Sequence, residues 1–323
     1  MSRILVTGAN GFVGRALCAD LSERGHQVVA AVRMHDKAGG IVCARAVAVG
    51  DIGPETDWRD ALAGVTGVVH TAARVHVMGE SARALHTRVN IEGTRRLAEA
   101  AAAAGVRRFV FLSSIKVMGE STEGRAPFSE RDTPAPHPGD AYAESKLAAE
   151  QALAELFRNG TLEPVVLRPP LVYGPGVGAN FALLMKLCRS GLPLPLAGIA
   201  NRRSLLYLGN LAHAVALTLE HPAAGGGTFL LSDGEDVSTP ELIRKIAAAE
   251  HRPARLFSFP PVTLRWAATL VGRGEAASRL LDSLSVDGRK IRDRLGWRPP
   301  FTMDQGLART IAGDGAEQGA STA

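Results

Sequence analysis

Residues 3–14 read RILVTGANGFVG, and this stretch decides how the chain begins to fold. Its first five residues form a short apolar run of the kind found in a buried parallel strand, and Arg15 to Arg24 has the pattern of an amphipathic helix. Three glycines separate the two: Gly8, Gly11 and Gly14. Glycines at this place allow a tight turn and a close approach to a pyrophosphate, whose charge faces the helix N-terminus. The stretch therefore predicts a dinucleotide site.

Strands and helices alternate beyond this first unit. Further apolar strands are expected at 28–32, 47–49, 68–73 and 108–112. Such alternation predicts a parallel sheet with right-handed crossovers. The expected fold class is α/β, a Rossmann doubly wound parallel sheet with a smaller C-terminal α/β lobe that binds the substrate.

The composition changes near residue 173 to shorter elements with more proline and glycine. Residues 204–220 are nevertheless expected to cross back to the first domain as a strand and a helix. Residues 262–272 are apolar, and we expect a buried amphipathic helix there rather than contact with a membrane surface. The expected divisions are a dinucleotide-binding domain at 1–172, a substrate lobe at 173–312 and a flexible tail at 313–323.

Residues after the second and third strands bear on the identity of the dinucleotide. An NAD site usually offers an acidic residue to the adenosine ribose after the second strand. This chain offers Arg33 instead, which favours a 2'-phosphate and hence NADP(H), with NAD(H) as the alternative. Asp51 and Ile52 follow the third strand and are placed to meet the adenine ring.

Tyr142 and Lys146 are four residues apart in a predicted helix and therefore project from one face. An ammonium close to the phenol would favour the ionised form of the Tyr. Because a free phenol has a pKa of about 10, such a neighbour makes it a better proton shuttle near neutral pH. Ser114 lies at the carboxyl end of the fifth strand, where ligands of a doubly wound sheet bind. By itself the Tyr-Lys spacing is also compatible with a surface pair.

The overall composition excludes several classes of protein. The net charge is +5, but Lys and Arg are scattered among 32 acidic residues, which favours a small anionic ligand over nucleic acid. No apolar run is long enough to span a bilayer and no signal peptide is recognised, so we expect a cytoplasmic protein without membrane insertion. The three cysteines are widely spaced and lack a CxxC pair, which predicts neither a disulfide framework nor a metal site.

A set of motifs in this chain resembles the extended short-chain dehydrogenase/reductase family, also described as NAD-dependent epimerases and dehydratases. The resemblance runs from residue 3 to about residue 312 and is strongest for nucleotide-sugar epimerases and reductases. The motifs, in chain order, are Gly8-x-x-Gly11-x-x-Gly14, His70-x-Ala72-Ala73, Asn90-x-x-Gly93-Thr94, Ser113-Ser114, Tyr142-x-x-x-Lys146 and Arg168-Pro169-x-x-Val172-Tyr173-Gly174-Pro175.

The resemblance implies a role for each matching residue. Tyr142 would be the acid/base, Lys146 would hold the nicotinamide ribose and lower the pKa of the Tyr, and Ser114 would hydrogen-bond the sugar oxygen. Hydride would pass between sugar C4 and nicotinamide C4. A homodimer through the helices near 90–104 and 142–157 is also implied. The expected cofactor residues are Gly8, Asn10, Gly11, Phe12, Val13, Gly14, Arg33, Asp51, Ile52, Ala72, Ala73, Asn90, Tyr142, Lys146 and Pro169.

A UDP-sugar is the implied substrate. A planar guanidinium suits phosphate oxygens, so Arg203 is the first choice for the diphosphate and Arg279 the second. Lys116 either contacts the substrate near the ketone or is a structural cation at a loop edge. The full expected set for the substrate is Ser114, Lys116, Tyr142, Asn180, Phe181, Leu196, Arg203 and Arg279.

The sequence also separates the family's reactions in part. A 4,6-dehydratase needs an Asp-Glu pair after the catalytic hydroxyl residue, where this chain has Ile115 and Lys116. Arg33 favours a reductase that binds NADPH and releases NADP in each turnover. The sequence around Ser114 and Arg168 resembles reductases of UDP-4-keto-6-deoxy-N-acetylglucosamine, which serve lipopolysaccharide and O-antigen synthesis. The alternatives are a UDP-glucose or UDP-N-acetylglucosamine 4-epimerase with tightly bound NAD and a non-catalytic dinucleotide-binding protein.

Overall fold

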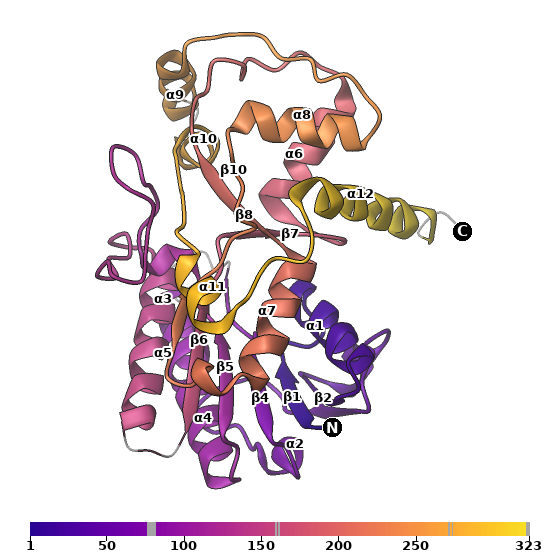
Figure 1. Ribbon diagram of the computed structural model, residues 1–323, viewed down its shortest axis with the longest axis vertical. Helices are drawn as coiled ribbons and strands as arrows, with labels where there is room; N and C mark the ends of the chain where they lie inside the picture. The colour runs from indigo at the N-terminus through magenta and orange to yellow at the C-terminus, as the bar shows by residue number, and fades with distance from the viewer. Residues whose placement is uncertain (76–81, 159, 161, 271, 273, 321–323) are drawn as a thin grey trace.

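The computed structural model describes residues 1–75, 82–158, 160, 162–270, 272 and 274–320. A large sheet with helices on both faces forms one end of the molecule, and a smaller lobe forms the other (Figure 1). The large sheet has the strand order β3-β2-β1-β4-β5-β6-β9, and every neighbouring pair is parallel. Its strands are β1 (Arg3–Thr7), β2 (Gln27–Val32), β3 (Arg45–Ala48), β4 (Gly67–His70), β5 (Arg108–Leu112), β6 (Glu163–Arg168) and β9 (Thr228–Leu230). The predicted Rossmann-type α/β fold is confirmed.

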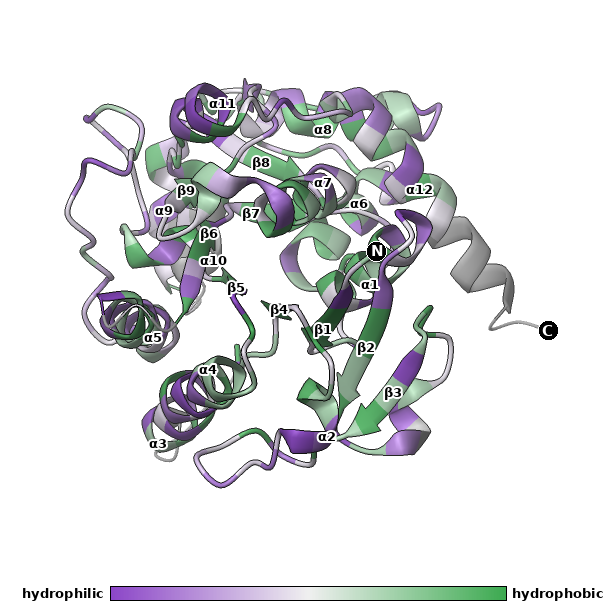
Figure 2. Cartoon of the chain, turned by 60° about the horizontal axis from the view of Figure 1, so that its bottom comes forward, coloured by the Kyte–Doolittle hydropathy of each residue, from purple (hydrophilic) through white to green (hydrophobic). Residues whose placement is uncertain are grey.

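Helices cover both faces of this sheet because its strands are apolar on both sides. In Figure 2 the central strands are mostly hydrophobic, whereas the covering helices α3 (Ala82–His86), α4 (Gly93–Ala103) and α5 (Ala141–Arg158) carry hydrophilic stripes. One buried cluster joins the sheet to α1 (Phe12–Glu23) and α7 (Leu208–Glu220), and a second joins it to α2 (Arg59–Leu62), α4 and α5. The strand order reverses between β1 and β4, which places a ligand crevice at their carboxyl ends.

Two sequence-based assignments in the second half need correction. Strand β8 (Arg203–Tyr207) lies in a small sheet of the lobe, between β7 (Leu171–Tyr173) and β10 (Asp236–Val237), so only α7 crosses back from the 204–220 segment. The physical reason is that Leu205 and Tyr207 pack into the lobe core, whereas the apolar face of α7 packs against α1. Strand β9, placed in the lobe by the expected boundaries, pairs with β6 in the large sheet.

The lobe is built from helices around the small sheet. They are α6 (Ala179–Ser190), α8 (Thr239–Ala249), α9 (Pro261–Leu270), α10 (Gly274–Leu281) and α12 (Met303–Ala320). Helix α11 (Arg289–Leu295) packs instead against β9 of the large sheet. The segment from 313, which is expected to be a flexible tail, is helical as far as Ala320. Residues 321–323 lie outside the described part.

A long loop before α5 connects the two domains. Backbone hydrogen bonds join Thr122 N to Ser283 O at 2.8 Å and Phe128 N to Ser285 O at 2.9 Å. The loop ends at Asp140, whose carboxylate accepts a hydrogen bond from Ala143 N at 3.0 Å in the first turn of α5. The lobe is therefore tied to the segment that leads into the Tyr142 helix.

Candidate active site

The glycine turn between β1 and α1 is too closely packed for a side chain at Gly8 or Gly14. Gly8 has φ +66°, and a Cβ there would lie 2.8 Å from Ala72 N. A Cβ on Gly14 would lie 2.0 Å from Gly8 O. Helix α1 begins after Gly11, which gives its first backbone N–H groups no side-chain cap. This cradle fits the pyrophosphate of a dinucleotide, since an anion can approach those N–H groups directly.

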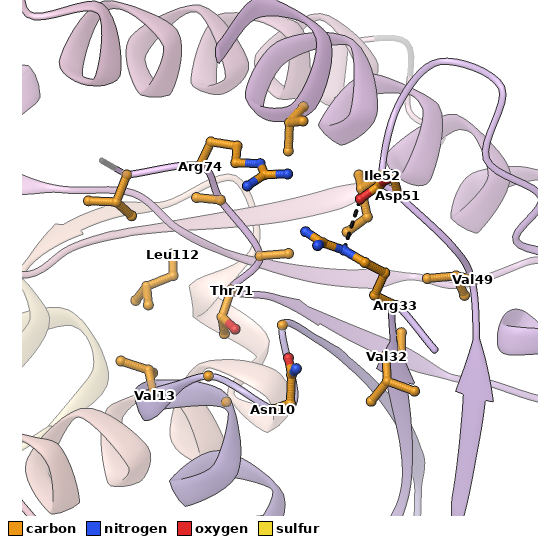
Figure 3. A pocket seen from close by; sticks show the side chains of 18 of the residues that line it. Asn10, Val13, Val32, Arg33, Val49, Asp51, Ile52, Thr71, Arg74 and Leu112 are labelled. Atoms are coloured by element: carbon orange, nitrogen blue, oxygen red, sulfur yellow. Dashed lines mark ion pairs between the residues drawn. The ribbon is translucent and has the colours of Figure 1, made fainter. Parts of the chain in front are cut away.

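A pocket extends from this turn along the carboxyl ends of the strands (Figure 3). All of the predicted cofactor residues except Asn90 and Pro169 line it. Sequence reasoning missed several others, although the ends of β2 and β4 and the segment after them are where a doubly wound sheet binds ligands. The missed lining residues are Ala31, Val32, Lys37, Val49, Gly50, Thr71, Arg74, Val75, Val89, Leu112 and Ser113.

Asn90 and Pro169 lie in the supporting scaffold. The Asn90 amide donates to Arg74 O at 3.0 Å and to Ser145 Oγ at 2.9 Å, and its oxygen accepts from Arg74 N at 2.8 Å. It therefore connects the segment after β4 to the turn of α5 between Tyr142 and Lys146. The carbonyl of Pro169 accepts from Ile115 N at 2.9 Å, which fixes the start of the Ser114 loop.

At the adenosine end of the pocket, Arg33 and Asp51 form an ion pair. Arg33 Nε lies 2.8 Å from Asp51 Oδ1, and both side chains are exposed. Figure 3 shows the pair at the end of β2, opposite Asn10. A carboxylate therefore already lies beside the Arg33 guanidinium.

Ser114 and Tyr142 meet at the other end of the pocket. Ser114 follows β5, Tyr142 lies in the first turn of α5, and the Ser114 hydroxyl is hydrogen-bonded to the phenol. The ring of His86 lies edge-on to the Tyr142 ring, with centroids 6.3 Å apart. Lys146 is buried one turn further, with Nζ 3.9 Å from the centre of the Phe111 ring. The predicted catalytic residues are thus brought together.

The predicted lowering of the Tyr142 pKa is wrong for the protein without a bound ligand. Burial raises the pKa of Tyr142 to about 12, although the Ser114 hydrogen bond acts to lower it. Burial also lowers the pKa of Lys146 to about 7. Removal from water is the largest cause of both shifts. The phenol consequently stays protonated at neutral pH and is ready to donate.

Lys116 has structural partners. Its ammonium lies 2.6 Å from Asp140 Oδ2 and 3.5 Å from Glu120 Oε1. Asp140 also accepts from a backbone N–H in the first turn of α5. The pair therefore links the Ser114 loop to the start of the Tyr142 helix, which supports the structural alternative for Lys116.

The predicted substrate residues of the lobe are dispersed. Phe181 is 3% exposed and stacks on Tyr173, with centroids 5.4 Å apart, so its side chain belongs to the core and is not available to a ligand. Asn180 is exposed at the start of α6, and Leu196 is half-buried. Arg203 donates to Asp282 O at 2.8 Å. Arg279 falls in α10, and its side chain lies outside the described part.

A buried ion pair joins α5 to the end of β6. Arg168 Nη2 lies 2.5 Å from Glu150 Oε2, and each side chain is only 7% exposed. The Ser113 hydroxyl donates to the same carboxylate. Glu150 is one turn after Lys146 and acts to raise the pKa of its ammonium. Sequence reasoning missed Glu150, although its four-residue spacing from Lys146 is visible in the chain.

Among the residues described, no three His, Cys, Asp or Glu side chains are grouped so as to hold a metal ion. None of the described helices is long and apolar enough to cross a membrane.

The buried Lys146 predicts an unusual dependence of stability on pH. Its folded pKa is about 7, below the unfolded value of 10.5, so between these values the unfolded chain binds more protons. The free energy of unfolding should therefore rise with pH over this range, by about 1.4 kcal/mol per unit at most. In urea unfolding, the free energy of unfolding of Lys146→Met should lack this rise with pH. The gain in stability of Lys146→Met over wild type should be largest near pH 6. The matched change at exposed Lys186, Lys186→Met, should leave the slope intact, and an unchanged slope in Lys146→Met would contradict the assignment.

The fold and the pocket are those of an NAD-dependent enzyme in which Tyr142 and Lys146 line the dinucleotide pocket. Residues 4–231 match the profile of the NAD dependent epimerase/dehydratase family, and the chain belongs to this family. The family predicted from the motifs is thus confirmed.

Similar proteins agree with this assignment. The chain is 40% identical over 313 residues to UDP-glucose 4-epimerase of Vibrio cholerae, with 95% of this chain and 94% of the relative covered. A short-chain dehydrogenase/reductase superfamily protein from Agrobacterium tumefaciens, crystallised with bound NAD, is 28% identical, with a TM-score of 0.76 and 99% of both chains covered. MoeE5 in complex with UDP-glucose and NAD is also 28% identical, with a TM-score of 0.76 and coverage of 98% of this chain and 99% of that one.

Proposed function

We propose that the protein transfers hydride to or from C4 of a UDP-sugar. The observation that carries this proposal is the hydrogen bond between Ser114 and Tyr142, because the Tyr142 side chain lines the same pocket as the glycine turn. Similarity to UDP-glucose 4-epimerase and to MoeE5 bound to UDP-glucose supports the substrate class.

The side chains present suit the proton part of this reaction. A bound nicotinamide supplies or accepts the hydride, and the glycine turn and Lys146 would hold that cofactor. The Tyr142 phenol donates its proton to the C4 ketone oxygen during reduction and removes the C4 hydroxyl proton during oxidation. The Ser114 hydroxyl would orient the same sugar oxygen. Because the free phenol has a raised pKa, a positive charge close to it is needed for the oxidative direction.

Two reactions of this kind remain. A UDP-sugar 4-epimerase stands first, since the relative at 40% identity is a UDP-glucose 4-epimerase. The second candidate is a 4-ketoreductase of a UDP-4-keto-6-deoxy-N-acetylhexosamine, which Arg33 favours because it supplies a cation at the ribose end of the pocket. A cytoplasmic homodimer joined through α4 and α5 is part of the same proposal, supported by the way these two helices lie side by side on one face of the sheet.

One experiment separates the two reactions. An epimerase should retain bound NAD through purification and interconvert UDP-glucose or UDP-N-acetylglucosamine with its 4-epimer without added cofactor. A reductase should be isolated without cofactor and should oxidise NADPH only when the 4-keto sugar is added. If neither activity is observed with any of these sugars, the proposed C4 chemistry is wrong.

The Arg33 and Asp51 pair predicts how cofactor preference is set. Arg33→Ala should weaken NADP binding roughly tenfold more than NAD binding, because a charged hydrogen bond to the 2'-phosphate is lost. Asp51→Asn should have the opposite effect, since it frees Arg33 and removes a charge that repels phosphate. Calorimetric titration with each cofactor measures both changes. Parallel changes for NAD and NADP in both variants would show that Arg33 does not contact the phosphate.

A further inference from the structure

Helix α9 presents large apolar side chains to solvent, where the sequence predicts a buried helix. Val262 is 78% exposed, Trp266 68% and Leu270 66%. Their four-residue spacing puts them on one side of the helix. Arg265, between them in the chain, forms an ion pair with Asp282 and so fastens α9 to the lobe. The prediction failed because an amphipathic pattern specifies an apolar face and does not specify what covers it.

Further exposed apolar side chains lie on two paired segments of the lobe. The backbone of residues 255–257 pairs with that of 194–197, with Leu194 N to Arg255 O at 2.8 Å and Ala197 N to Phe257 O at 3.1 Å. Exposed apolar side chains follow on both segments, and Figure 1 shows the segments and α9 at the end of the lobe away from the large sheet. We call this surface the distal apolar face, and its residues are Leu192, Phe257, Phe259, Val262, Trp266 and Leu270.

Two arginines at or beside residues 255–257 add positive charge to the distal apolar face. The chain contains no Asp or Glu from residue 251 to residue 274, nor from 164 to 219. Arg252 and Arg255 are exposed and donate to the backbone carbonyls of Arg189 at 2.8 Å and Gly191 at 3.3 Å. Bonds to neutral carbonyls leave the two positive charges uncancelled. The surface therefore combines exposed aromatic and aliphatic groups with arginines.

We propose that the distal apolar face binds the surface of a bilayer that contains anionic lipids, with α9 lying among the headgroups. Apolar side chains entering the interface and arginines contacting lipid phosphates are the two contributions that hold interfacial helices. At 10 residues α9 is too short to span a bilayer, so the contact is peripheral. A second copy of the chain fits less well, because pairing through the same face would bring like charges together.

Trp266 provides a direct probe of this contact. The chain has three tryptophans, and the other two, Trp58 and Trp297, are 1% and 2% exposed. A blue shift of tryptophan emission on adding vesicles to the full-length protein therefore reports α9. We expect the shift, with co-sedimentation, for vesicles of equal parts phosphatidylglycerol and phosphatidylcholine, and much weaker binding to pure phosphatidylcholine. Trp266→Phe should remove the shift while retaining most of the binding.

Surface variants complete the test. Val262→Asp combined with Leu270→Asp should weaken binding to the anionic vesicles by at least about tenfold, and Arg252→Glu with Arg255→Glu by about fivefold per arginine. Val42→Asp, at a site 55% exposed in the other domain, should bind as wild type does. The proposal is overturned if wild type does not bind anionic vesicles at low salt, or if both double variants bind equally well. It is also overturned if Trp266 emission shifts with protein concentration in the absence of lipid, which would show that a second copy covers the face.

Discussion

Tyr142→Phe should lower kcat by about 100- to 10,000-fold, the range that a positioned general acid or base contributes. The Tyr142 phenol is hydrogen-bonded to the Ser114 hydroxyl and keeps its proton at neutral pH. Phe retains the ring and its edge-on contact with His86, so the pocket keeps its shape. Binding of NAD or NADP should therefore stay within about twofold of wild type, since the change removes an interaction used in the chemical step.

The chain contains a matched control for this variant. It has three tyrosines, and Tyr207 is 5% exposed in the lobe core, outside the residues that line the pocket. Tyr207→Phe removes the same hydroxyl and should leave kcat nearly unchanged. Steady-state kinetics and cofactor titration on both variants measure the difference. Turnover near the wild-type value in Tyr142→Phe would reject the assigned proton donor.

Glu150→Gln should reduce the free energy of unfolding by about 3–5 kcal/mol, because it leaves the Arg168 guanidinium buried without a counter-charge. The same carboxylate accepts a hydrogen bond from the hydroxyl of Ser113, which precedes Ser114 in the chain. It also acts to raise the pKa of Lys146, so activity should fall along with stability. The urea concentration at half unfolding, taken with the slope of the transition, measures the loss.

A double variant tests whether the loss comes from the unpaired charge. Glu150→Leu with Arg168→Met removes both charges, and most of the stability should return, since replacing a buried pair by apolar groups is often neutral. Glu55→Gln breaks the exposed pair between Glu55 and Arg88, and it should change stability by no more than about 1 kcal/mol. If Glu150→Gln costs no more than Glu55→Gln, the buried pair does not support the site as described.

Local sequence patterns predicted the glycine turn between β1 and α1. The glycine turn depends on backbone geometry that only glycine permits, so its sequence pattern and its structure correspond closely. The Tyr142 helix and the strand before Ser114 are likewise short local units. Their meeting follows from the parallel topology, which brings strand ends to one edge of the sheet.

The parts that could not be predicted depend on contacts distant in the chain. The pKa of Tyr142 is set by burial against several elements, and a spacing of four residues in a helix gives no measure of burial. Lys116 pairs with Asp140 across 24 residues, and Arg203 bonds a carbonyl 79 residues away. The placement of β8 and β9 in different sheets was missed for the same reason, because strand pairing across domains has no local signature.

The origin of the hydrogen at sugar C4 tests the central claim most directly. The protein is incubated with UDP-glucose and with UDP-N-acetylglucosamine in deuterated water, and the product is examined by NMR. If the enzyme is an epimerase, hydride transfer predicts that the 4-epimer keeps its original hydrogen at C4. If it is a reductase, the matching experiment supplies the 4-keto sugar with labelled NADPH, and the label should appear at C4. Deuterium from the solvent at C4 of the product would mean that the enzyme removes the C4 proton, and would contradict the account.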